Sequence, residues 1–401
     1  MKKALMLASV ASMIEQFNMK NIELLKNIGY EVDVITNFEY GSTMPQEKVD
    51  ALKEHLKSDG VDPVHVPIPR KIFDVSGIIN SYRLVKKECE EKKYKLLHCQ
   101  SPIGGVIARF AARKIRKKVG TKVIYTAHGF HFCKGAPLKN WLIFFPIEWL
   151  CSFFTDTLIT INKEDYNFAK KYMKAKEIQY VPGVGIDTEK ISNTAFDREL
   201  KRQELGALNG QAALLSVGEL NDNKNHETVI RAISRIKNDN ITYIICGKGD
   251  KEEYLRSLAD ELGVKLILPG YRNDIVEIYK SCDLFVFPSK REGLSVALME
   301  AMAAGLPVVC SNIRGNTDLV KDGENGFLCG ATDEDEFAER IGTLLANEAL
   351  RFEMGLKSKD VIKDFDLKKV TEKMCTVYGL TDKDHNTYEG ERNEKTTYSH
   401  S

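Results

Sequence analysis

The sequence predicts an α/β protein with two doubly wound parallel sheets that follow one another along the chain. Short β-rich runs alternate with amphipathic helical runs, which is typical of parallel sheets. The alternation runs through the first half of the chain and begins again near residue 212. At 401 residues the chain has room for about two domains, taking roughly 150 residues for each.

Each half of the chain contains its own series of candidate strands. The first series comprises KALMLA, EVDVIT, LLHC, KVIYTAH, TLITI and IQYVPG, with helical stretches at 76–93 and 105–118. The second comprises AALLSVGEL, ITYIICGKG, VKLILPG, LFVFPS, PVVCSN and GFLC, with helical stretches at 226–237, 251–262, 273–281 and 295–304. The two series are therefore expected to form two sheets.

A polar, turn-rich segment at 185–210 separates the two series and is the expected hinge. We expect a first domain over 1–190 and a second over 191–380, with a last helix at about 365–380 that could pack back on the first domain. The tail at 381–401 has almost no aliphatic side chains, so we expect it to be disordered.

The composition excludes several classes of protein. The chain carries 58 basic and 57 acidic side chains, so no overall charge attracts nucleic acid. Its nine cysteines contain no CxxC pair, which favours reduced thiols in the cytoplasm. The N-terminus is better explained as a strand than as a signal peptide. The most apolar segment, 141–154, is too short to cross a bilayer and contains Pro146 and Glu148, so we expect no transmembrane helix.

Ligands of doubly wound sheets bind at the carboxyl ends of strands, and polar residues and glycines gather at four such ends in the second half. In SVGELNDNKNHE, Gly218 ends a strand and Lys224 follows, either to neutralise a phosphate or as a solvated loop lysine. CGKGD places Gly247 and Gly249 after an apolar strand, which alone is weak evidence beyond a tight turn. LPGYRND offers a stacking or backbone platform.

The fourth strand end leads into the stretch REGLSVALMEAMAAGLP, in which a loop precedes a helix. Backbone N–H groups near Gly293, Leu294 and Ser295 form a site for an anion. Glu300 follows Gly293 by seven residues, close to two helical turns and roughly 10 Å along the axis. A diphosphate at the helix start could therefore place a ribose against Glu300, while Glu292 would face the group at its other end.

The alternative is that Glu292 offsets the helix dipole and that Glu300 is unrelated to it. Glu300 lies among Ala, Met and Leu residues on an otherwise apolar helix. An unpaired carboxylate is costly in such a place, and this cost favours a ligand for the pair.

The stretches EGLSVALME, AMAAGLPVV, SVGELNDNKNHE and FVFPS together resemble the donor domain of retaining GT-B glycosyltransferases of family 4. The pair Glu292 and Glu300 matches the E-x7-E motif of that family, and the resemblance extends through GNTDLVKDGENGFL at 315–328. It implies the GT-B fold, in which two Rossmann-like domains face each other across a cleft. The first would bind the acceptor and the second the nucleotide-sugar donor.

The resemblance also implies roles for individual residues. Glu300 would bind the nucleotide ribose, Glu292 would contact the donor sugar hydroxyls, and Lys224 would hold the diphosphate. His128 would point into the cleft near the donor sugar and complete the expected catalytic set with Glu292 and Lys224. The other expected donor-binding residues, with Tyr271 and Arg272 at the nucleobase, are Gly218, Glu219, Gly247, Gly293, Leu294, Ser295 and Ser12.

Two positions depart from the family pattern. Many relatives have arginine where this chain has Glu219, so Lys224 would carry more of the diphosphate charge or another residue would take that role. The first loop, SVASMIEQF, has Ser9, Ser12 and Met13 in place of a glycine-rich turn. This weakens the case for a direct backbone contact with the donor phosphate there.

Relatives with YTAHGFHF and GAPL act in capsule or exopolysaccharide assembly, so the resemblance implies a saccharide on undecaprenyl diphosphate as the acceptor. The run RFAARKIRKK places Arg109, Arg113, Arg116 and Lys117 along one side of a short helix, and NWLIFFPIEWLCSFF supplies apolar bulk. The alternative is a solvated cationic face beside an internal core helix. The resemblance favours peripheral contact with the inner leaflet, at the cytoplasmic face of the membrane.

We therefore predict a retaining, metal-independent glycosyltransferase that needs no cofactor and moves a hexose or N-acetylhexosamine from a nucleotide-sugar donor, expected to be a UDP-sugar. No DxD lies at a strand end, because DED at 333–335 opens a helix and DKD at 382–384 lies in the tail. His128 and His131 could suggest a metal pair, but no carboxylate or cysteine constellation joins them. Lys224 and the helix N-terminus would stabilise the leaving group instead.

Three other classes remain as alternatives. A nucleotide-sugar epimerase with the same fold would need no acceptor. A dinucleotide oxidoreductase would need GxGxxG after the first strand, and ASVASMIEQ lacks those glycines. A non-catalytic nucleotide-sugar-binding partner of another transferase would bind the donor without turnover.

Overall fold

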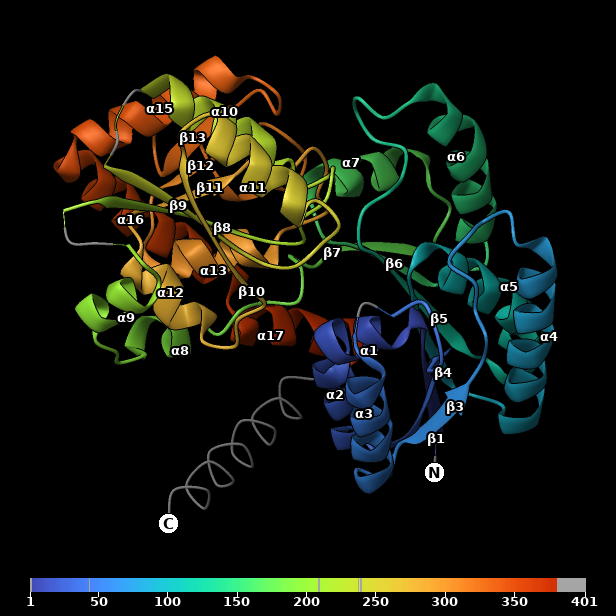
Figure 1. The fold of residues 1–401 in the computed structure, drawn as a ribbon. Helices are drawn as coiled ribbons and strands as arrows, with labels where there is room; N and C mark the ends of the chain where they lie inside the picture. Colours follow the sequence, from blue (N-terminus) through green and yellow to red (C-terminus); the bar gives the residue numbers. More distant parts are fainter. Residues whose placement is uncertain (1, 43, 208–209, 237, 239, 381–401) are drawn as a thin grey trace, which may run out of the picture. The chain divides into compact units, whose positions relative to one another are not determined.

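The structure, a computed structural model, describes residues 2–42, 44–207, 210–236, 238 and 240–380 (Figure 1). It divides into two compact units. The first unit comprises the chain up to Val184 together with the described residues from Val370 onward, and the second comprises Gly185–Lys369. The predicted disordered tail lies outside the described residues.

The first unit is a seven-stranded parallel sheet in the order β3-β2-β1-β4-β5-β6-β7. Its strands are β1 (Lys2–Val10), β2 (Tyr30–Asn37), β3 (Asp62–His65), β4 (Leu96–Gln100), β5 (Lys122–Ala127), β6 (Thr157–Thr160) and β7 (Glu177–Tyr180). Its helices are α1 (Ala11–Phe17), α2 (Met19–Asn27), α3 (Gln46–Ser58), α4 (Val75–Lys92), α5 (Pro102–Val119), α6 (Leu138–Ser152), α7 (Lys163–Tyr172) and most of α17 (Leu367–Tyr378).

Strand β1 shows how the sequence forms this sheet. Its residues 4–8, ALMLA, are apolar without interruption, which is typical of a strand covered by helices on both faces. Because side chains alternate along a strand, Ala4 and Met6 pack into one core with α1, α2, α3 and α17, whereas Leu5 and Leu7 pack into another with α4 and α5. Helix α17, more than 350 residues after β1 in the sequence, therefore completes the core beneath β1.

Strand β3 was not predicted from the sequence. Its residues, DPVH, contain Pro63, which has no N–H to donate to a neighbouring strand. The strand pairs only with β2 and lies at the edge of the sheet, where proline is tolerated.

The second unit is a six-stranded parallel sheet in the order β10-β9-β8-β11-β12-β13. Its strands are β8 (Ala212–Val217), β9 (Ile241–Cys246), β10 (Lys265–Gly270), β11 (Leu284–Phe287), β12 (Val308–Ser311) and β13 (Gly326–Cys329). Its helices are α8 (Thr188–Asn193), α9 (Arg198–Glu204), α10 (His226–Ile236), α11 (Glu252–Glu261), α12 (Ile275–Ser281), α13 (Val296–Ala304), α14 (Asn316–Leu319), α15 (Glu334–Ala346) and α16 (Glu348–Ile362).

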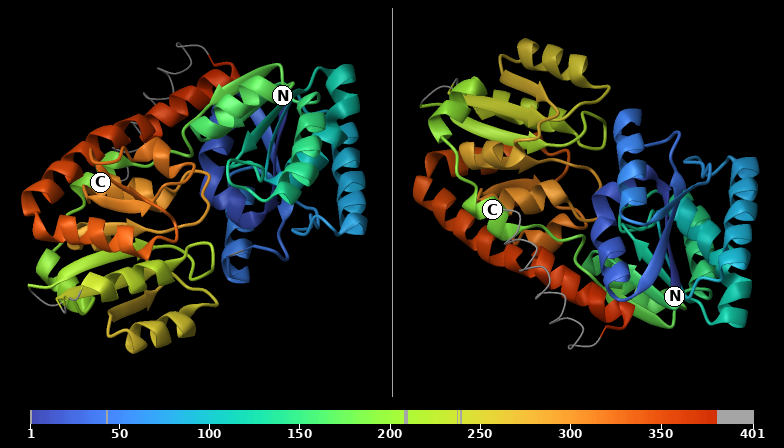
Figure 2. Two further views of the ribbon diagram at one scale, coloured as in Figure 1. Left: turned by 90° about the horizontal axis from the view of Figure 1, so that it is seen from above. Right: turned by 90° about the horizontal axis from the view of Figure 1, so that it is seen from below.

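Both sheets confirm the prediction of two doubly wound domains. In each unit helices cover both faces of the sheet (Figure 2). Each strand order reverses once, between β1 and β4 in the first unit and between β8 and β11 in the second. We call these two places the switch points. Ligands of such sheets bind outside the carboxyl ends of the strands at the switch point.

The expected hinge at 185–210 is not a plain linker, because its described residues form α8 and α9. Each of these helices is short and begins at an aspartate that caps it: Asp187 accepts from the N–H of Lys190, and Asp197 accepts from the N–H of Leu200. Within the described part of the chain, no helix is both long and apolar enough to cross a membrane.

Candidate active site

The switch point of the second unit is built from the loops that follow β8 and β11. Side-chain amides hold these two loops together. Asn225 Nδ2 donates to the carbonyl oxygens of Pro288 (3.1 Å) and Ala331 (2.7 Å). Asn223 Nδ2 donates to the carbonyl oxygen of Arg291 at 3.0 Å. The asparagines of the run NDNKN therefore fix the loop that carries Lys224, a role that their local pattern does not predict.

Lys224 and Glu292, the two predicted catalytic residues of this unit, lie across the switch point and form an ion pair. Lys224 Nζ donates to Glu292 Oε1 at 2.7 Å, and both side chains are mostly buried. The ammonium also lies 4.9 Å from the centroid of the Phe287 ring. A side chain at Gly218 would crowd this lysine, because its Cβ would lie 3.1 Å from Lys224 Cε. Gly218 therefore leaves room for the lysine stem.

The loop before α13 presents unpartnered backbone donors. Ser295 caps the helix, and its Oγ accepts from the N–H of Leu298 at 3.3 Å. The N–H groups of Gly293, Leu294 and Ser295 itself donate to no group among the described residues. Donors of this kind at a helix N-terminus form a site for an anion.

Two residues that the sequence analysis missed support this loop from β12. A Cβ on Gly315, where φ is +82°, would lie 2.3 Å from the carbonyl oxygen of Gly293. Arg314 Nε donates to the carbonyl oxygen of Glu292 at 3.2 Å, which brings a second cation to this edge of the sheet. The sequence signal is the segment IRGN, which places a glycine four residues after the last residue of a buried strand.

Glu300 lies on α13 and is largely buried. Burial raises its pKa above the usual value for glutamate, and the hydrogen bond donated by Tyr279 Oη to Oε2 at 3.1 Å acts in the opposite direction. Its other carboxylate oxygen has no partner among the described residues. The helix begins at Val296 rather than at Gly293, so Glu300 lies one turn beyond Val296 on the same face, about 6 Å along the axis.

Glu219 and Gly247 have no specific polar contact with Lys224 or Glu292. Glu219 is exposed at the end of β8. A Cβ on Gly247 would lie 1.8 Å from the carbonyl oxygen of Gly218, and one on Gly249 would lie 2.3 Å from that of Leu220. These two glycines are therefore required for close packing of the strand-end loops, independently of any ligand.

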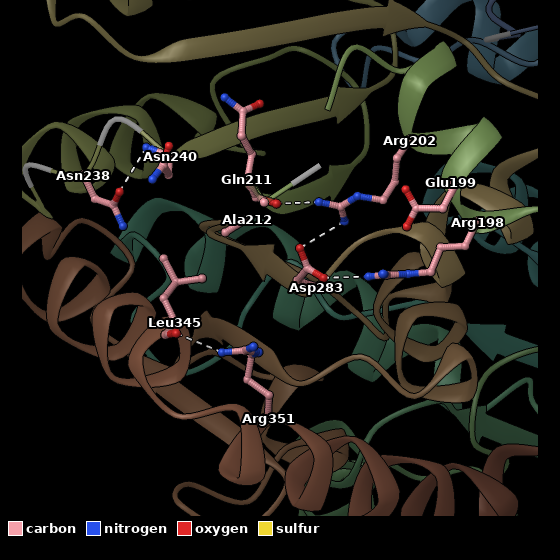
Figure 3. Close-up of a pocket in the computed structure, with 11 residues that line it drawn as sticks. Arg198, Glu199, Arg202, Gln211, Ala212, Asn238, Asn240, Asp283, Leu345 and Arg351 are labelled. Atoms are coloured by element: carbon pink, nitrogen blue, oxygen red, sulfur yellow. Dashed lines mark hydrogen bonds and ion pairs between the residues drawn. The ribbon is translucent and has the colours of Figure 1, made fainter. Parts of the chain in front are cut away.

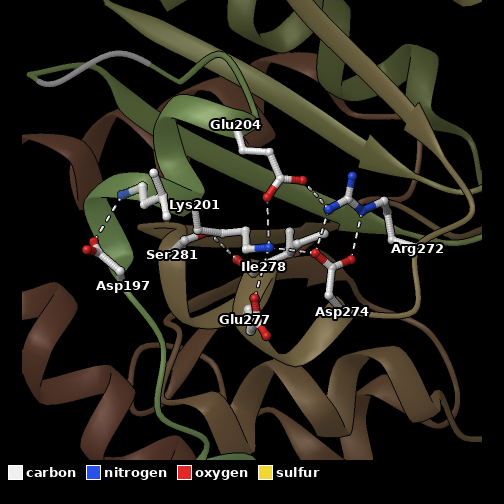
Figure 4. Close-up of polar contacts among 9 residues, drawn as sticks. Asp197, Lys201, Glu204, Arg272, Asp274, Glu277, Ile278 and Ser281 are labelled. Atoms are coloured by element: carbon white, nitrogen blue, oxygen red, sulfur yellow. Dashed lines mark hydrogen bonds and ion pairs between the residues drawn. The ribbon is translucent and has the colours of Figure 1, made fainter.

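Arg272 belongs to an ion-pair network between α9 and α12 (Figure 4). Its Nε donates to Asp274 Oδ1 at 2.7 Å, and its Nη2 contacts both Asp274 and Glu204. Lys201 contacts the same two carboxylates at 2.7 and 2.8 Å. The guanidinium hydrogen bond holds the pKa of Asp274 well below its usual range. Neighbouring Tyr271 is exposed, and the predicted contact of both residues with a nucleobase stays a prediction.

The switch point of the first unit is closed by hydroxyl groups. Ser9 Oγ and Ser101 Oγ are 2.7 Å apart, and the N–H of Ser9 donates to Ser101 Oγ at 3.0 Å. Ser9 Oγ also accepts from the N–H of Gly104 at 3.0 Å. Ser101 has a positive φ of +64°, which is uncommon outside glycine. Ser12 is buried within α1.

His128 follows β5 and is held by Gln100, the last residue of β4. Its Nε2 lies 2.5 Å from Gln100 Oε1, and its ring packs against Phe17 with centroids 5.1 Å apart. Burial lowers the pKa of His128 to about 4, so its ring is neutral at physiological pH. His131 packs against Phe144. Within the described ranges, no group of three or more His, Cys, Asp or Glu residues could hold a metal ion.

The prediction of a continuous basic stripe on the helix at 109–118 was wrong. Arg109 is buried: Nη2 pairs with Glu148 Oε2 at 2.8 Å, and the guanidinium lies 3.8 Å from the centroid of the Tyr125 ring. Arg116 forms two hydrogen bonds with Asp156, at 2.6 and 2.8 Å. These two arginines tie α5 to α6 and β6. Of the predicted stripe, Arg113 and Lys117 are exposed.

A cavity of about 430 Å³ lies at the opposite edge of the second sheet (Figure 3). Ala212, the first residue of β8, and Asp283, directly before β11, place it at the amino ends of the strands. Its arginines already have partners: Arg198 pairs with Asp283 at 2.7 Å, and Arg351 donates to the carbonyl oxygen of Leu344 at 2.6 Å. The cavity is therefore separate from the switch point.

Solved structures with this architecture identify the fold. Anabaena HepE in complex with UDP matches with a TM-score of 0.73 at 20% identity, over 94% of this chain and 99% of that chain. Sucrose-phosphate synthase from Thermosynechococcus elongatus matches with a TM-score of 0.74 at 17% identity, over 94% and 98%. Together with the two doubly wound units, these likenesses define the GT-B fold of glycosyltransferases.

Sequence relatives identify the family. The family model "Glycosyl transferases group 1" matches residues 197–361, and "Glycosyltransferase Family 4" matches residues 19–190. The Bacillus subtilis protein EpsD is 35% identical over 94% of this chain and 96% of its own length. The Escherichia coli UDP-Gal:alpha-D-GlcNAc-diphosphoundecaprenol alpha-1,3-galactosyltransferase is 28% identical over 93% and 95%. The chain therefore belongs to the family 4 glycosyltransferases.

Proposed function

We propose that this glycosyltransferase moves one sugar, a hexose or N-acetylhexosamine, from a UDP-sugar to a saccharide carried on undecaprenyl diphosphate, with retention of anomeric configuration. The observation that carries the proposal is the second switch point. There, the loop residues Gly293, Leu294 and Ser295 have N–H groups without a partner among the described residues. They directly follow Glu292, which pairs with Lys224, and precede the largely buried Glu300 in the chain.

The donor diphosphate binds at the N-terminus of α13. The free backbone N–H groups donate to its oxygens, and the positive end of the helix dipole adds to their effect. Lys224 has three N–H donors, so it can contact a phosphate while it stays paired with Glu292. Arg314 beside the carbonyl of Glu292 supplies a second cation, in a loop other than that of Glu219. These charges stabilise the leaving UDP without a metal ion.

The nucleoside and the sugar lie on opposite sides of the diphosphate. The unpartnered oxygen of Glu300 accepts hydrogen bonds from the ribose hydroxyls. These hydrogen bonds offset the desolvation of the buried Glu300 carboxylate. Glu292 accepts from hydroxyls of the donor sugar. In transfer, the bond between the anomeric carbon and the UDP oxygen breaks, and the acceptor oxygen bonds to that carbon from the same face. The acceptor proton passes to the departing phosphate oxygen.

The acceptor assignment rests on relatives. The Escherichia coli relative acts on a sugar linked to diphosphoundecaprenol, and a Campylobacter jejuni relative, 34% identical over 160 residues, is named as a diphospho-undecaprenol N-acetylgalactosaminyltransferase. A place in exopolysaccharide or capsule synthesis rests on the resemblance of the YTAHGFHF and GAPL segments to the family. A lipid-linked acceptor would bring the protein to the cytoplasmic face of the membrane.

The test is to incubate the purified chain with a panel of UDP-sugars, with and without a synthetic undecaprenyl-diphosphate-linked N-acetylhexosamine, and to follow UDP release and product. One donor should give acceptor-dependent UDP release and an axial or equatorial linkage that matches the donor, as read by NMR. Full activity in excess EDTA is expected, and strict Mg²⁺ dependence would contradict the metal-free step. A changed sugar without acceptor would identify an epimerase, and no turnover with any donor would favour a non-catalytic partner.

We also propose that α6 docks on an anionic lipid surface. Leu138, Leu142, Trp149 and Phe153 recur at intervals of four and seven residues, which places them on one side of the helix, and all four are exposed. Exposed Lys139 flanks this stripe on the same helix. Apolar side chains beside cations are typical of helices that bind the surface of acidic membranes.

Co-sedimentation with vesicles that contain phosphatidylglycerol measures this docking. Leu142→Ser should lower the bound fraction several-fold, because it removes one apolar side chain from the stripe. Phe352→Ser on α16 is the matched control, since Phe352 and Leu142 are each 69% exposed. Equal losses in both variants would contradict a specific role for α6.

A further inference from the structure

A chain of side-chain amides links His128 to the backbone of α1. Asn18 Nδ2 donates to the carbonyl oxygen of Met13 at 2.7 Å. Asn18 Oδ1 accepts from Gln100 Nε2, and Gln100 Oε1 lies 2.5 Å from His128 Nε2. Asn18 and Gln100 are almost completely buried. No local sequence pattern predicts a role for either residue.

The backbone carbonyl of Met13 determines which atom of Asn18, Gln100 and His128 donates and which accepts in this series of hydrogen bonds. A backbone carbonyl can only accept, so the Asn18 amide must present its nitrogen to Met13 and its oxygen to Gln100. Gln100 must then present its nitrogen to Asn18 and its oxygen to His128. An amide oxygen also only accepts, so His128 Nε2 carries the hydrogen. The neutral ring therefore leaves a lone pair on Nδ1.

Nδ1 of His128 is the atom that remains available. No described residue forms a hydrogen bond with it, and the side chain is partly exposed. Phe17 packs against the ring at a centroid distance of 5.1 Å and restricts its rotation. A lone pair held in a fixed direction can accept one hydrogen bond, and a sugar hydroxyl is a suitable donor.

We propose that Asn18 and Gln100 are positioning residues that hold His128 as the Nε2–H tautomer, so that its Nδ1 accepts a hydrogen bond from a hydroxyl of the donor sugar. The role of the hydroxyl rests on the proposed function, whereas the tautomer does not. His128 then acts neither as a general base that gains a proton nor as a positive charge that stabilises the leaving group. It orients the sugar as a neutral acceptor.

Neighbouring titratable groups are compatible with a neutral ring. His98 on β4 interacts electrostatically with His128, and burial lowers the pKa of His98 to about 3. Its two ring nitrogens are each 2.8 Å from a hydroxyl, those of Thr126 and Tyr378. His98 therefore remains neutral over the pH range in which His128 stays neutral.

Long-range ¹H–¹⁵N NMR of the histidine side chains in the full chain tests the tautomer without any substrate. We expect His128 to show a protonated Nε2 and an unprotonated Nδ1 from neutral pH down to about pH 4. A protonated Nδ1 in the neutral ring, or titration near the usual value of 6.5, would overturn the proposal. This outcome does not depend on whether the chain transfers sugar.

Gln100→Glu tests the link to activity. The variant keeps the size of the side chain and its acceptor oxygen, but its carboxylate stabilises the imidazolium form, so the pKa of His128 should rise. At neutral pH Nδ1 would then carry a hydrogen and could no longer accept. We expect transfer at pH 7 to fall at least tenfold and the acidic limb of the pH–rate profile to move to higher pH, with activity recovering as pH rises.

Gln46→Glu on α3 is the matched control, because it adds the same charge to the same unit at an exposed position whose side chain contacts Phe38 and Asp50 rather than His128. It should leave the pH profile unchanged. A uniform loss in Gln100→Glu with an unshifted profile would show that Gln100 only supports the fold, and it would overturn the proposal. If the wild-type chain shows the expected tautomer but transfers no sugar, the proposed function fails and the positioning of His128 stands.

Discussion

At the switch point of the first unit, two neutral hydroxyls, those of Ser9 and Ser101, share a hydrogen bond of 2.7 Å, whereas at the second an ion pair of the same length joins Lys224 and Glu292. The strand order around the two points is the same. In the first unit, the hydroxyls also accept from the backbone N–H groups of Ser9 and Gly104. In the second unit, the corresponding loop keeps its N–H groups unpartnered among the described residues.

The comparison shows that topology provides a place for a ligand but not its charge. The first switch point has used its donors internally, so a phosphate would have to break existing hydrogen bonds in order to bind there. The second switch point offers backbone N–H donors and the cation Lys224, and a phosphate could bind these N–H groups without breaking existing hydrogen bonds. A nucleotide is therefore expected at the second point, and neutral hydroxyl groups of a sugar at the first.

The largest expected effect is on transfer by Glu292→Gln. The amide keeps the shape of the side chain but has no negative charge and presents an N–H donor in place of one acceptor oxygen, so turnover should fall about 100- to 1,000-fold. UDP affinity should hold or rise, because Lys224 loses its carboxylate partner. Product formation and isothermal titration with UDP measure the two effects. Parallel losses of turnover and UDP affinity would contradict the division of roles.

Gly315→Ala should destabilise the second unit by about 2–4 kcal/mol, because the new Cβ meets the Gly293 carbonyl and φ is +82°. Urea unfolding followed by circular dichroism reports this loss. Tryptophan fluorescence should change less, since Trp141 and Trp149 both lie on α6 in the first unit. Gly342→Ala, at a helical position with open space around it, is the control and should not destabilise. Equal effects at both glycines would refute the close-packing argument.

Glu300→Gln should weaken UDP binding about tenfold, by the loss of one charged hydrogen-bond acceptor. The same change should stabilise the free protein at neutral pH. Burial raises the pKa of Glu300, so the native state binds a proton more readily than the unfolded state, and stability falls as pH rises through the raised value. Glutamine does not titrate and avoids this loss. Titration calorimetry and thermal unfolding from pH 4 to pH 8 measure both effects, and unchanged UDP affinity would remove Glu300 from the ribose site.

The smallest expected effect is that of Ser9→Ala, which leaves the N–H of Gly104 without its hydroxyl partner and should cost the first unit about 1 kcal/mol. Tryptophan fluorescence during urea unfolding reports on this unit. UDP affinity should not change. A tenfold loss of UDP affinity would place the phosphate at the first switch point. It would contradict the conclusion that the nucleotide binds at the second switch point.

Local pattern was sufficient to predict most of the fold. Unbroken apolar runs such as LFVF and VVCS can only be buried strands or helices, and their short length and flanking turns identify them as strands. The acidic start DED was correctly assigned to a helix, and Asp333 caps α15. β3 was missed because its four residues include a proline. The pattern there was too short to outweigh a residue that breaks strands.

The candidate site was harder to predict because its contacts join distant parts of the chain. Lys224 and Glu292 are 68 positions apart, so no local spacing could reveal that they pair. The same limit explains Arg109, whose helical periodicity suggested a surface stripe but whose partner Glu148 lies 39 positions away on another helix. Gly247 was placed among the expected donor-binding residues, and no local pattern predicts its packing role: a Cβ there would lie 1.8 Å from the carbonyl oxygen of Gly218, 29 positions earlier in the chain.

Helix α17 has a consequence for biosynthesis. The chain enters the second unit at Gly185 and returns to the first only at Val370, where Val370, Met374 and Val377 fill the core beneath β1. A ribosome therefore releases every residue of the second unit before it has made the last part of the first. The first unit, most of which is translated first, therefore keeps an open apolar face until α17 emerges. A chaperone that binds nascent chains would be expected to protect that face.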